Sequence, residues 1–220
     1  MTRVALFHTV ASLSGRFEEL AAEHLDDAEW YHAVDESVLD DMLDAGELTP
    51  NVTERICTQL SLAQRGGADV ILDTCSSTSP AVDIARALID VPIVKIDDPM
   101  TERAIDLGDR IAVVATAAST LGPSRALIER KGEAAGRDVT VETVLVDDAF
   151  EARRAGDRET HDELVSAAVE DLADDVDVVV LAQASMSHLE PSLSERVSVP
   201  LLSSPDLAMK RVAELASAST

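Results

Sequence analysis

A repeat within this sequence relates its two halves and limits the folds that the chain can adopt. The segment RIAVVATAASTLG at 110–122 matches RVALFHTVASLSG at 3–15 in six of 13 positions, at an offset of 107 residues. Three further pairs match at an offset of 108: Asp69-Val70 with Asp177-Val178, Ser77 with Ser185, and Val91-Pro92 with Val199-Pro200. A nearly constant offset over separate segments is typical of an internal duplication. We therefore expect two similar halves.

Short β-branched runs alternate with longer helical stretches along each half. In the first half the predicted strands are VALFHTV at 4–10, EWYHAV at 29–34, ADVILDT at 68–74 and VPIVKI at 91–96. Strands separated by helices form βαβ units with a mainly parallel sheet. We predict an α/β protein of two pseudo-symmetric flavodoxin-like halves, residues 1–98 with 205–220 and residues 99–204. The acidic segment Asp35 to Pro50 is predicted to be a long connection.

The charge of the chain excludes several classes of partner. It contains 18 Lys and Arg residues and 42 Asp and Glu residues, which gives a net charge of −24. Such a surface repels phosphate, so we expect no nucleic-acid partner and no anionic membrane partner. The composition suits a salt-rich cytoplasm, and a halophilic source is our working hypothesis. No apolar run approaches the roughly 20 residues of a membrane helix, and two cysteines give no disulfide framework, so we expect a cytoplasmic protein.

Ligands of such sheets bind beyond the carboxyl ends of the strands. In a duplicated chain we therefore expect the active site in the cleft between the halves. Small polar residues follow the predicted strands there. In the first half they are His8, Thr9, Thr74, Cys75, Ser76 and Ser77, and in the second half Thr116, Thr120, Gln183, Ala184 and Ser185.

Cys75 is the residue of this set with the most distinctive chemistry. It follows a predicted strand and precedes a helix that begins near Ser79, and free N–H groups at a helix start lower the pKa of a thiol. The alternative is a small buried residue in a tight turn. His8 could be a base, a proton donor or a structural residue, and His24, His32 and His161 are expected to be exposed. No metal-ligand spacing or phosphate-binding glycine motif occurs, so neither a metal site nor a phosphate cradle for a dinucleotide or nucleoside triphosphate is expected.

These segments together resemble the aspartate/glutamate/hydantoin racemase superfamily over nearly the whole chain. The resemblance rests on DVILDTCSS, LAQASM, the HTV and ATAAST loops and the duplicated plan; LAQASM and GDRETHDEL point to an aspartate/glutamate racemase-like branch. It implies a cofactor-independent isomerase in which two opposed cysteines exchange a proton at the carbon next to a carboxylate. Such inversion needs acid–base groups on both faces of the carbon. Cys75 matches the first cysteine, whereas Gln183 stands at the second, where no proton can be exchanged.

Three functions follow from this departure. The first is a racemase or epimerase whose second proton comes from His8, Thr116 or water. The second is a one-cysteine decarboxylase or isomerase, similar to the related arylmalonate decarboxylases, and the third is a non-catalytic carboxylate-binding protein. In the first two Cys75 is the acid–base group, with His8 orienting or protonating. The remaining strand-end residues would hold the carboxylate, Asp35-Glu36 could bind a substrate ammonium, and homo-oligomers are possible.

Overall fold

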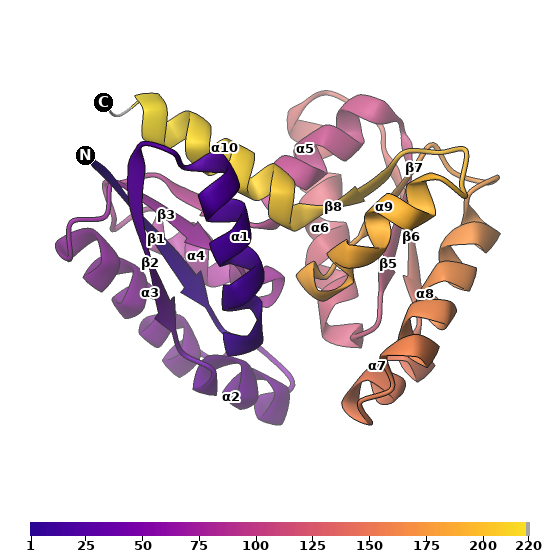
Figure 1. Ribbon diagram of the computed structural model, residues 1–220, viewed down its shortest axis with the longest axis horizontal. Helices are drawn as coiled ribbons and strands as arrows, with labels where there is room; N and C mark the ends of the chain where they lie inside the picture. The colour runs from indigo at the N-terminus through magenta and orange to yellow at the C-terminus, as the bar shows by residue number, and fades with distance from the viewer. Residues whose placement is uncertain (219–220) are drawn as a thin grey trace. The chain divides into compact units, whose positions relative to one another are not determined.

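The computed structural model describes residues 1–218, and these residues form two compact units. The first comprises Met1–Ile96 and the described chain from Pro205, and the second is Asp97–Ser204. The described residues contain two four-stranded sheets, one in each unit, and all strand pairs are parallel. The prediction of two α/β halves with parallel sheets is thus confirmed (Figure 1).

The first unit has the strand order β2-β1-β3-β4. Its strands are β1 (Thr2–His8), β2 (Ala28–Val34), β3 (Val70–Asp73) and β4 (Ile93–Lys95). Its helices are α1 (Ser14–His24), α2 (Ser37–Ala45), α3 (Pro50–Arg65), α4 (Ser79–Ala85) and α10 (Ser204–Ala218), with the 3-10 turns η1 (Ala11–Leu13) and η2 (Ser76–Thr78). Every residue of β3 is buried, as expected for a strand covered by helices on both faces.

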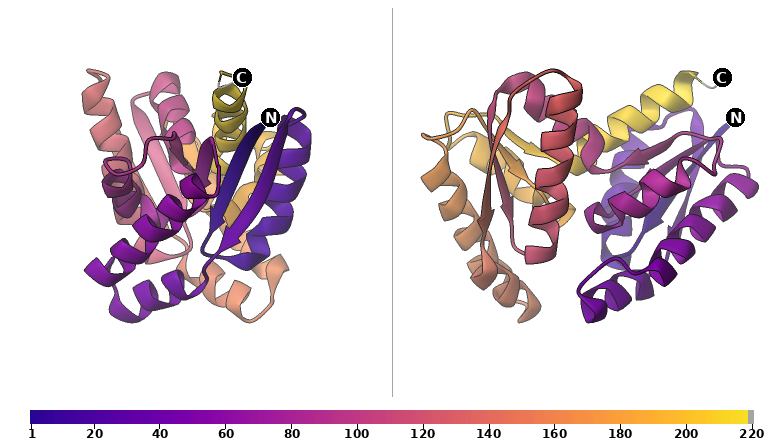
Figure 2. Two further views of the ribbon diagram at one scale, coloured as in Figure 1. Left: turned by 90° about the vertical axis from the view of Figure 1, so that its left-hand side faces the viewer. Right: turned by 180° about the vertical axis from the view of Figure 1, so that it is seen from behind.

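Helices cover both faces of this first sheet. On one face, side chains of β1 and β3 pack against α3 and α4 in a single apolar cluster that includes Phe7, Ile56 and Ile71. On the other face lies α1, which buries Phe17 and Leu20. Figure 2 shows the sheet edge-on, with α1 and α10 on one side and α2 and α3 on the other. The helices thus cover the faces of the sheet, and loops follow the carboxyl ends of its strands.

The second unit repeats this plan with the order β6-β5-β7-β8. Its strands are β5 (Arg110–Ala115), β6 (Thr140–Leu145), β7 (Val178–Leu181) and β8 (Leu201–Ser203). Its helices are α5 (Asp97–Leu107), α6 (Ala118–Ala134), α7 (Asp147–Arg154), α8 (Arg158–Leu172) and α9 (Glu190–Ser194), with the 3-10 segment η3 (Ala184–Leu189). One apolar cluster joins β5 and β7 to α8, η3 and α9.

One backbone clamp occurs in both units and reflects the sequence repeat. The Arg3 N–H donates to Asp69 Oδ2 at 2.8 Å, and the Asp69 N–H returns a bond to the Arg3 carbonyl at 2.7 Å. Arg110 and Asp177 make the same two bonds at 2.9 and 2.8 Å. In each unit the clamp fixes the start of the first strand against the turn before the third.

The fold differs from the sequence-based expectations in two respects. The connection predicted from Asp35 to Pro50 contains helix α2, which buries Val38 against the first core. Of the histidines expected to be exposed, His161 is buried, while His24 and His32 are half-buried and each bonds a carboxylate. These side chains are covered by partners from other elements, which the local pattern does not reveal.

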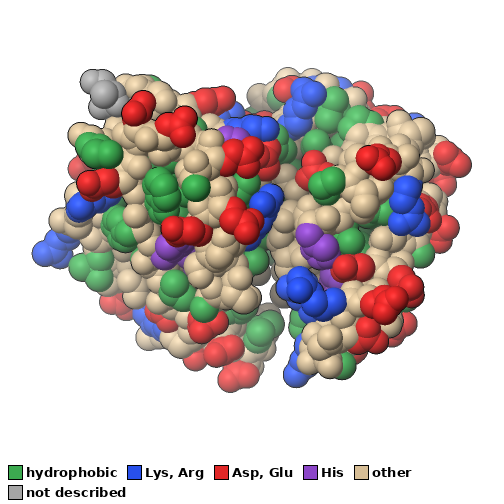
Figure 3. All heavy atoms as spheres, viewed as in Figure 1, with side chains coloured by type: hydrophobic (Ala, Val, Ile, Leu, Met, Phe, Trp, Pro, Cys, Tyr) green, Lys and Arg blue, Asp and Glu red, His purple; other side chains and the backbone are tan. Residues whose placement is uncertain are grey.

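The surface carries the acidic excess of the sequence. Figure 3 shows Asp and Glu side chains scattered over the visible face of each unit, with fewer Lys and Arg side chains among them. Within residues 1–218, no helix is both long and apolar enough to cross a membrane.

Candidate active site

The thiol of Cys75 lies just beyond the end of β3. The residue has an extended backbone and is followed at once by the 3-10 turn η2, whose last residue, Thr78, donates its N–H to the Cys75 carbonyl at 3.2 Å. Helix α4 then begins at Ser79, as the sequence predicted. The sulfur faces the Thr9 hydroxyl and the backbone N–H groups of Ser77 and Thr78. These donors form a cradle that can stabilise a negative charge.

The pKa of Cys75 departs from the sequence-based expectation. Burial raises the pKa of the thiol, and the negative charge of the nearby Asp73 raises it further. The nearby Thr9 hydroxyl and the N–H groups of Ser77 and Thr78 act in the opposite direction but do not prevail. The expected lowering was therefore wrong, because the buried carboxyl of Asp73 and the loss of hydration outweigh the donors. Near neutral pH the residue is a thiol.

His8 is fully buried, and both of its ring nitrogens are occupied. Nδ1 lies 2.8 Å from the Thr74 hydroxyl and Nε2 lies 2.8 Å from Nδ1 of His32. Burial, followed by the charge of His32, lowers the pKa of His8 to about 4. Such a ring is neutral at physiological pH and fixed within its own unit. This placement favours a role in holding the Thr74 loop.

Gln183 occupies in the second unit the position that Cys75 occupies in the first. Its backbone is again extended and is followed by the 3-10 segment η3. Its side-chain Oε1 accepts the Thr116 N–H at 2.6 Å, the Thr116 hydroxyl at 3.0 Å and the Ala117 N–H at 3.3 Å. Three donors fix the orientation of the amide, so the Nε2 group remains as the donor for a ligand.

The other predicted site residues divide into three groups. Ser76 and Ser77 form η2 beside Cys75, while Ala184 and Ser185 begin η3 beside Gln183. Thr120 is buried in the first turn of α6. Asp35 and Glu36, considered for a substrate ammonium, have partners of their own. Asp35 bonds Arg55 at 3.1 Å and Ser37 at 2.6 Å, and Glu36 accepts the Ala11 N–H at 3.0 Å.

Arg153 of α7 is a candidate that the sequence analysis missed. Its Nη1 donates to the Ser185 carbonyl at 3.4 Å, at the loop that begins with Gln183. Among residues 1–218 it is the one half-buried Arg or Lys that forms no ion pair with a carboxylate. Burial and then the charge of Arg158 lower its pKa, and the negative charge of Asp162 acts in the opposite direction without prevailing. The sequence gives no signal for this residue, because the absence of an ion pair in so acidic a chain is visible only in the structure.

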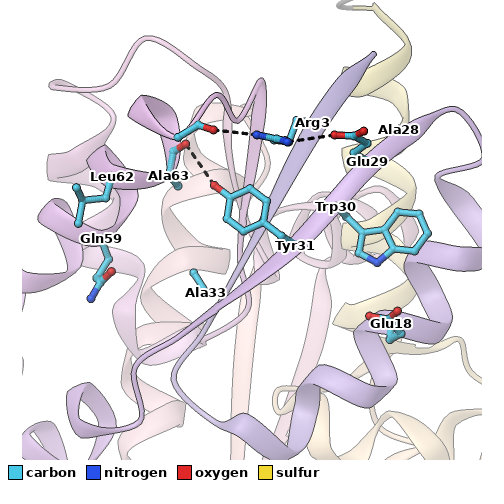
Figure 4. Close-up of a pocket in the computed structure, with 11 residues that line it drawn as sticks. Arg3, Glu18, Ala28, Glu29, Trp30, Tyr31, Ala33, Gln59, Leu62 and Ala63 are labelled. Atoms are coloured by element: carbon cyan, nitrogen blue, oxygen red, sulfur yellow. Dashed lines mark hydrogen bonds and ion pairs between the residues drawn. The ribbon is translucent and has the colours of Figure 1, made fainter.

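An open hollow of about 870 Å³ lies elsewhere, along the edge strand β2. Figure 4 shows its lining, which includes Trp30, Tyr31 and Leu62 and contains neither Cys75 nor His8. Within the described part of the chain, no group of three His, Cys, Asp or Glu side chains could hold a metal ion. The strand-end loops are the candidates for chemistry because Cys75 and Gln183 lie there beside backbone N–H donors.

Comparison with known proteins gives this geometry a context. The sequence profile of the Asp/Glu/hydantoin racemase family matches residues 8–212. A proposed Asp/Glu racemase from Yersinia pestis has a similar structure at 17% identity and a TM-score of 0.80, with 98% of this chain and 99% of that chain covered. No curated protein matches the sequence.

Two further solved structures share the fold. Allantoin racemase from Klebsiella pneumoniae is 17% identical with a TM-score of 0.70, and 100% of this chain and 89% of that chain are covered. Glutamate racemase from Francisella tularensis, solved with D-glutamate, is 12% identical with a TM-score of 0.73, and the covered shares are 99% and 82%.

Proposed function

Because this chain belongs to the Asp/Glu/hydantoin racemase family, we propose that it is a cofactor-independent racemase or epimerase that moves a proton at the carbon next to a carboxylate. The observation that carries the proposal is the thiol of Cys75 at the end of β3, with the Thr9 side chain and the backbone N–H groups of Ser77 and Thr78 close to it. A proton-transfer group must accept and release charge at one fixed place, and this cradle supplies donors for the charged form.

In the proposed reaction the Cys75 thiolate takes the proton from the carbon next to the carboxylate. The electron pair of the broken C–H bond moves toward the carboxylate and gives an enediolate-like intermediate. Return of a proton to this carbon, on the same or the opposite face, restores the C–H bond. Donors aimed at the carboxylate oxygens lower the energy of this intermediate most, because the charge develops there.

Gln183 and Arg153 are the proposed donors to a substrate oxygen. The amide Oε1 is held by three bonds, which directs the Nε2 group to a ligand rather than to its own unit. The Arg153 guanidinium, bonded to the Ser185 carbonyl, adds a positive charge beside the same loop. The substrate class that suits these donors is a carboxylate, and one with a second anionic group would engage both.

The source of a second proton decides between inversion and retention. Gln183 does not titrate, the Thr116 hydroxyl donates to Gln183, and both nitrogens of His8 are engaged. Of the three donors considered from the sequence, water is therefore the one that this racemase proposal retains. Proton return by water on the opposite face inverts the carbon, and return by Cys75 retains it.

A second candidate function is a one-cysteine decarboxylase of a malonate-type dicarboxylate. The raised pKa of Cys75 favours it, because a neutral thiol is already the proton donor that such a reaction needs. Loss of CO₂ breaks the carbon–carboxylate bond and leaves its electron pair on the carbon. The Cys75 S–H then protonates that carbon, and the resulting thiolate regains a proton from water.

The experiment that tests both is proton exchange in D₂O, followed by NMR at high salt. Aspartate, glutamate, hydantoins and aryl- or alkyl-malonates are incubated with the wild type and with Cys75→Ala, with Cys57→Ala as the matched control. Loss of a Cα–H signal that requires Cys75 and not Cys57 supports the proposal. Inversion identifies the racemase, retention a one-base enzyme, and CO₂ release the decarboxylase. Saturable dicarboxylate binding without exchange or CO₂ release would contradict an enzymatic role.

The pH dependence separates the same two reactions. Because the pKa of Cys75 is raised, the thiolate that abstracts a proton becomes abundant only above the ordinary thiol range near 8.5. Exchange should therefore keep rising with pH through that range. Decarboxylation, which needs the thiol, should stay constant and fall only above it.

A further inference from the structure

A series of hydrogen bonds links the loop of Cys75 to the protein surface through two histidines. The Thr74 hydroxyl, just before Cys75, lies 2.8 Å from Nδ1 of His8. Nε2 of His8 lies 2.8 Å from Nδ1 of His32, and Nε2 of His32 lies 2.8 Å from Oε2 of Glu18. The series runs from a buried strand end to an exposed carboxylate on α1.

The two ends of this series fix the positions of its protons. The Thr74 hydroxyl donates to the Phe7 carbonyl at 2.9 Å, so its oxygen accepts from His8. Nδ1 of His8 therefore carries a proton, and Nε2 of the neutral ring accepts one from His32. His32 then donates at both nitrogens, to His8 and to the Glu18 carboxylate. The pattern places His32 between a neutral imidazole and an anion.

The electrostatics of the neighbouring groups agree with this assignment. After burial, the charge of His32 is the second cause that lowers the pKa of His8 to about 4. Hydrogen bonds from His32 and from Trp30 lower the pKa of Glu18, so the glutamate is ionised. Each neighbour of His32 is therefore in the state that the hydrogen-bond pattern requires.

Strand β2 is built to present His32 to these partners. His32 pairs with Leu6 in the parallel register of β1 and β2, which places it beside His8 at the carboxyl end. Figure 4 shows Trp30 and Glu18 on one side of β2 and Tyr31 and Ala33 on the other. Because side chains alternate along a strand, His32 shares the side of Trp30 and Glu18.

We propose that His32 is a positioning residue for Cys75. It locks His8 as the neutral Nδ1–H tautomer, and His8 in turn holds the Thr74 hydroxyl at the base of the thiol loop. His8 also directly precedes Thr9, whose side chain lies near the Cys75 sulfur, so the histidine adjoins both segments beside the thiol. The proposal rests on the proposed function only in taking Cys75 as the reacting group.

The test compares two replacements of His32 in a Cys57→Ala background. In His32→Leu no donor faces His8, whereas in His32→Asn the amide nitrogen takes the place of Nδ1 and restores that bond. We expect His32→Leu to raise the pKa of His8 from about 4 and to mix its tautomers in ¹⁵N NMR spectra. Two rates should change by roughly 10- to 100-fold: the alkylation of Cys75 by iodoacetamide and the Cys75-dependent exchange in D₂O. The change in the exchange rate should appear in kcat more than in KM. His32→Asn should restore the tautomer and most of both rates.

A matched control and a second variant keep the test decisive. His24→Leu removes another histidine–carboxylate pair of the same unit, the 2.9 Å contact with Asp206, and should leave the tautomer and both rates unchanged. If His32→Leu does not fold, Glu18→Gln at the exposed end should shift the tautomer and both rates in the same direction by less. An unchanged His8 tautomer and unchanged alkylation in a folded variant would overturn the proposal. The NMR and alkylation readouts need no turnover. If the wild type lacks exchange but the variants still show these shifts relative to it, only the proposed function is refuted.

Discussion

At the scale of single residues, the buried carboxyl of Asp73 sets the chemistry of the candidate site. It ends β3 two residues before Cys75 and is fully buried. The Thr78 hydroxyl lies 2.6 Å from Asp73 Oδ2 and 2.6 Å from the Cys75 carbonyl, so it joins the carboxyl to the loop of the thiol. The negative charge opposes thiolate formation, so near neutral pH Cys75 is present as the thiol, which can donate a proton but cannot accept one.

Replacing Asp73 by Asn should lower the pKa of Cys75. The amide keeps an acceptor for Thr78 but removes the charge that disfavours the thiolate. The pH profile of iodoacetamide alkylation, measured in the Cys57→Ala background, should move to lower pH. Asp44→Asn, an exposed change of equal charge in α2, is the control and should leave the profile in place. An unmoved profile in Asp73→Asn would show that burial alone raises the pKa.

Replacing Gln183 by Glu tests the proposed amide donor. The carboxylate can still accept from Thr116 and Ala117, but it offers no N–H to a ligand and repels an anionic one. A lost hydrogen bond to a charged group costs about 1.5–3 kcal/mol, so KM for a carboxylate substrate should rise roughly 10- to 100-fold. Gln59→Glu in α3 is the matched control. Equal KM values in the two variants would exclude Gln183 from substrate binding.

At the scale of secondary-structure elements, the sequence predicts the central strands β1 and β3 well because they are almost wholly buried apolar runs between helices. Helix α2 was not predicted, since it is short, three of its nine residues are Asp and Val38 is the one residue that it buries. In the site, the local sequence predicts which residues follow the strands. It does not predict that Gln183 bonds Thr116 or that His8 bonds His32, because those contacts depend on the register of neighbouring strands. The raised pKa of Cys75 depends on burial in the same way.

Asp162 joins two elements of the second unit, α8 and η3. Its carboxylate oxygens lie 2.7 Å from Nδ1 of His161 and 2.9 Å from Nε2 of His188, and His188 also contacts the Ser185 carbonyl at 3.1 Å. Burial raises the pKa of Asp162, but these hydrogen bonds outweigh it and lower the pKa overall. The link therefore ties the GDRETHDEL segment to the loop that begins at Gln183.

Asp162→Asn should lower the free energy of unfolding at neutral pH by about 1–2 kcal/mol. Because the folded pKa of Asp162 lies below its unfolded value near 3.9, the stabilisation is present above that value and is lost as the pH falls through the folded pKa. The difference between wild type and variant, measured by urea denaturation, should therefore shrink below about pH 4. Asp171→Asn, an exposed change in the same helix, should have little effect. A difference that does not vary with pH would contradict this assignment.

At the scale of the whole molecule, the net charge of −24 opposes the approach of an anionic substrate. Screening shortens the range of this repulsion, from a Debye length of about 10 Å at 0.1 M salt to about 3 Å at 1 M. The positive charge of Arg153 acts only over a short distance. High salt should therefore favour binding of a carboxylate.

Salt should accelerate reactions of Cys75 with anions more than those with neutral reagents. Iodoacetate and iodoacetamide differ in charge but alkylate the same sulfur, so the ratio of their rates measures the local potential. In the Cys57→Ala background this ratio should rise from 0.1 M to 2 M salt, and KM for an anionic substrate should fall. A ratio that is constant or falls with salt would contradict both the halophilic hypothesis and the anionic-substrate hypothesis.

The aromatic residues of the chain are distributed unequally between its duplicated halves. The single Trp and the single Tyr of the sequence are Trp30 and Tyr31, neighbours on β2 in the first unit. Ultraviolet absorbance and tryptophan fluorescence therefore observe one half of the protein, whereas far-ultraviolet circular dichroism observes both. The second half is optically silent by comparison, so the chain carries an intrinsic label that distinguishes melting of its first half from melting of the whole.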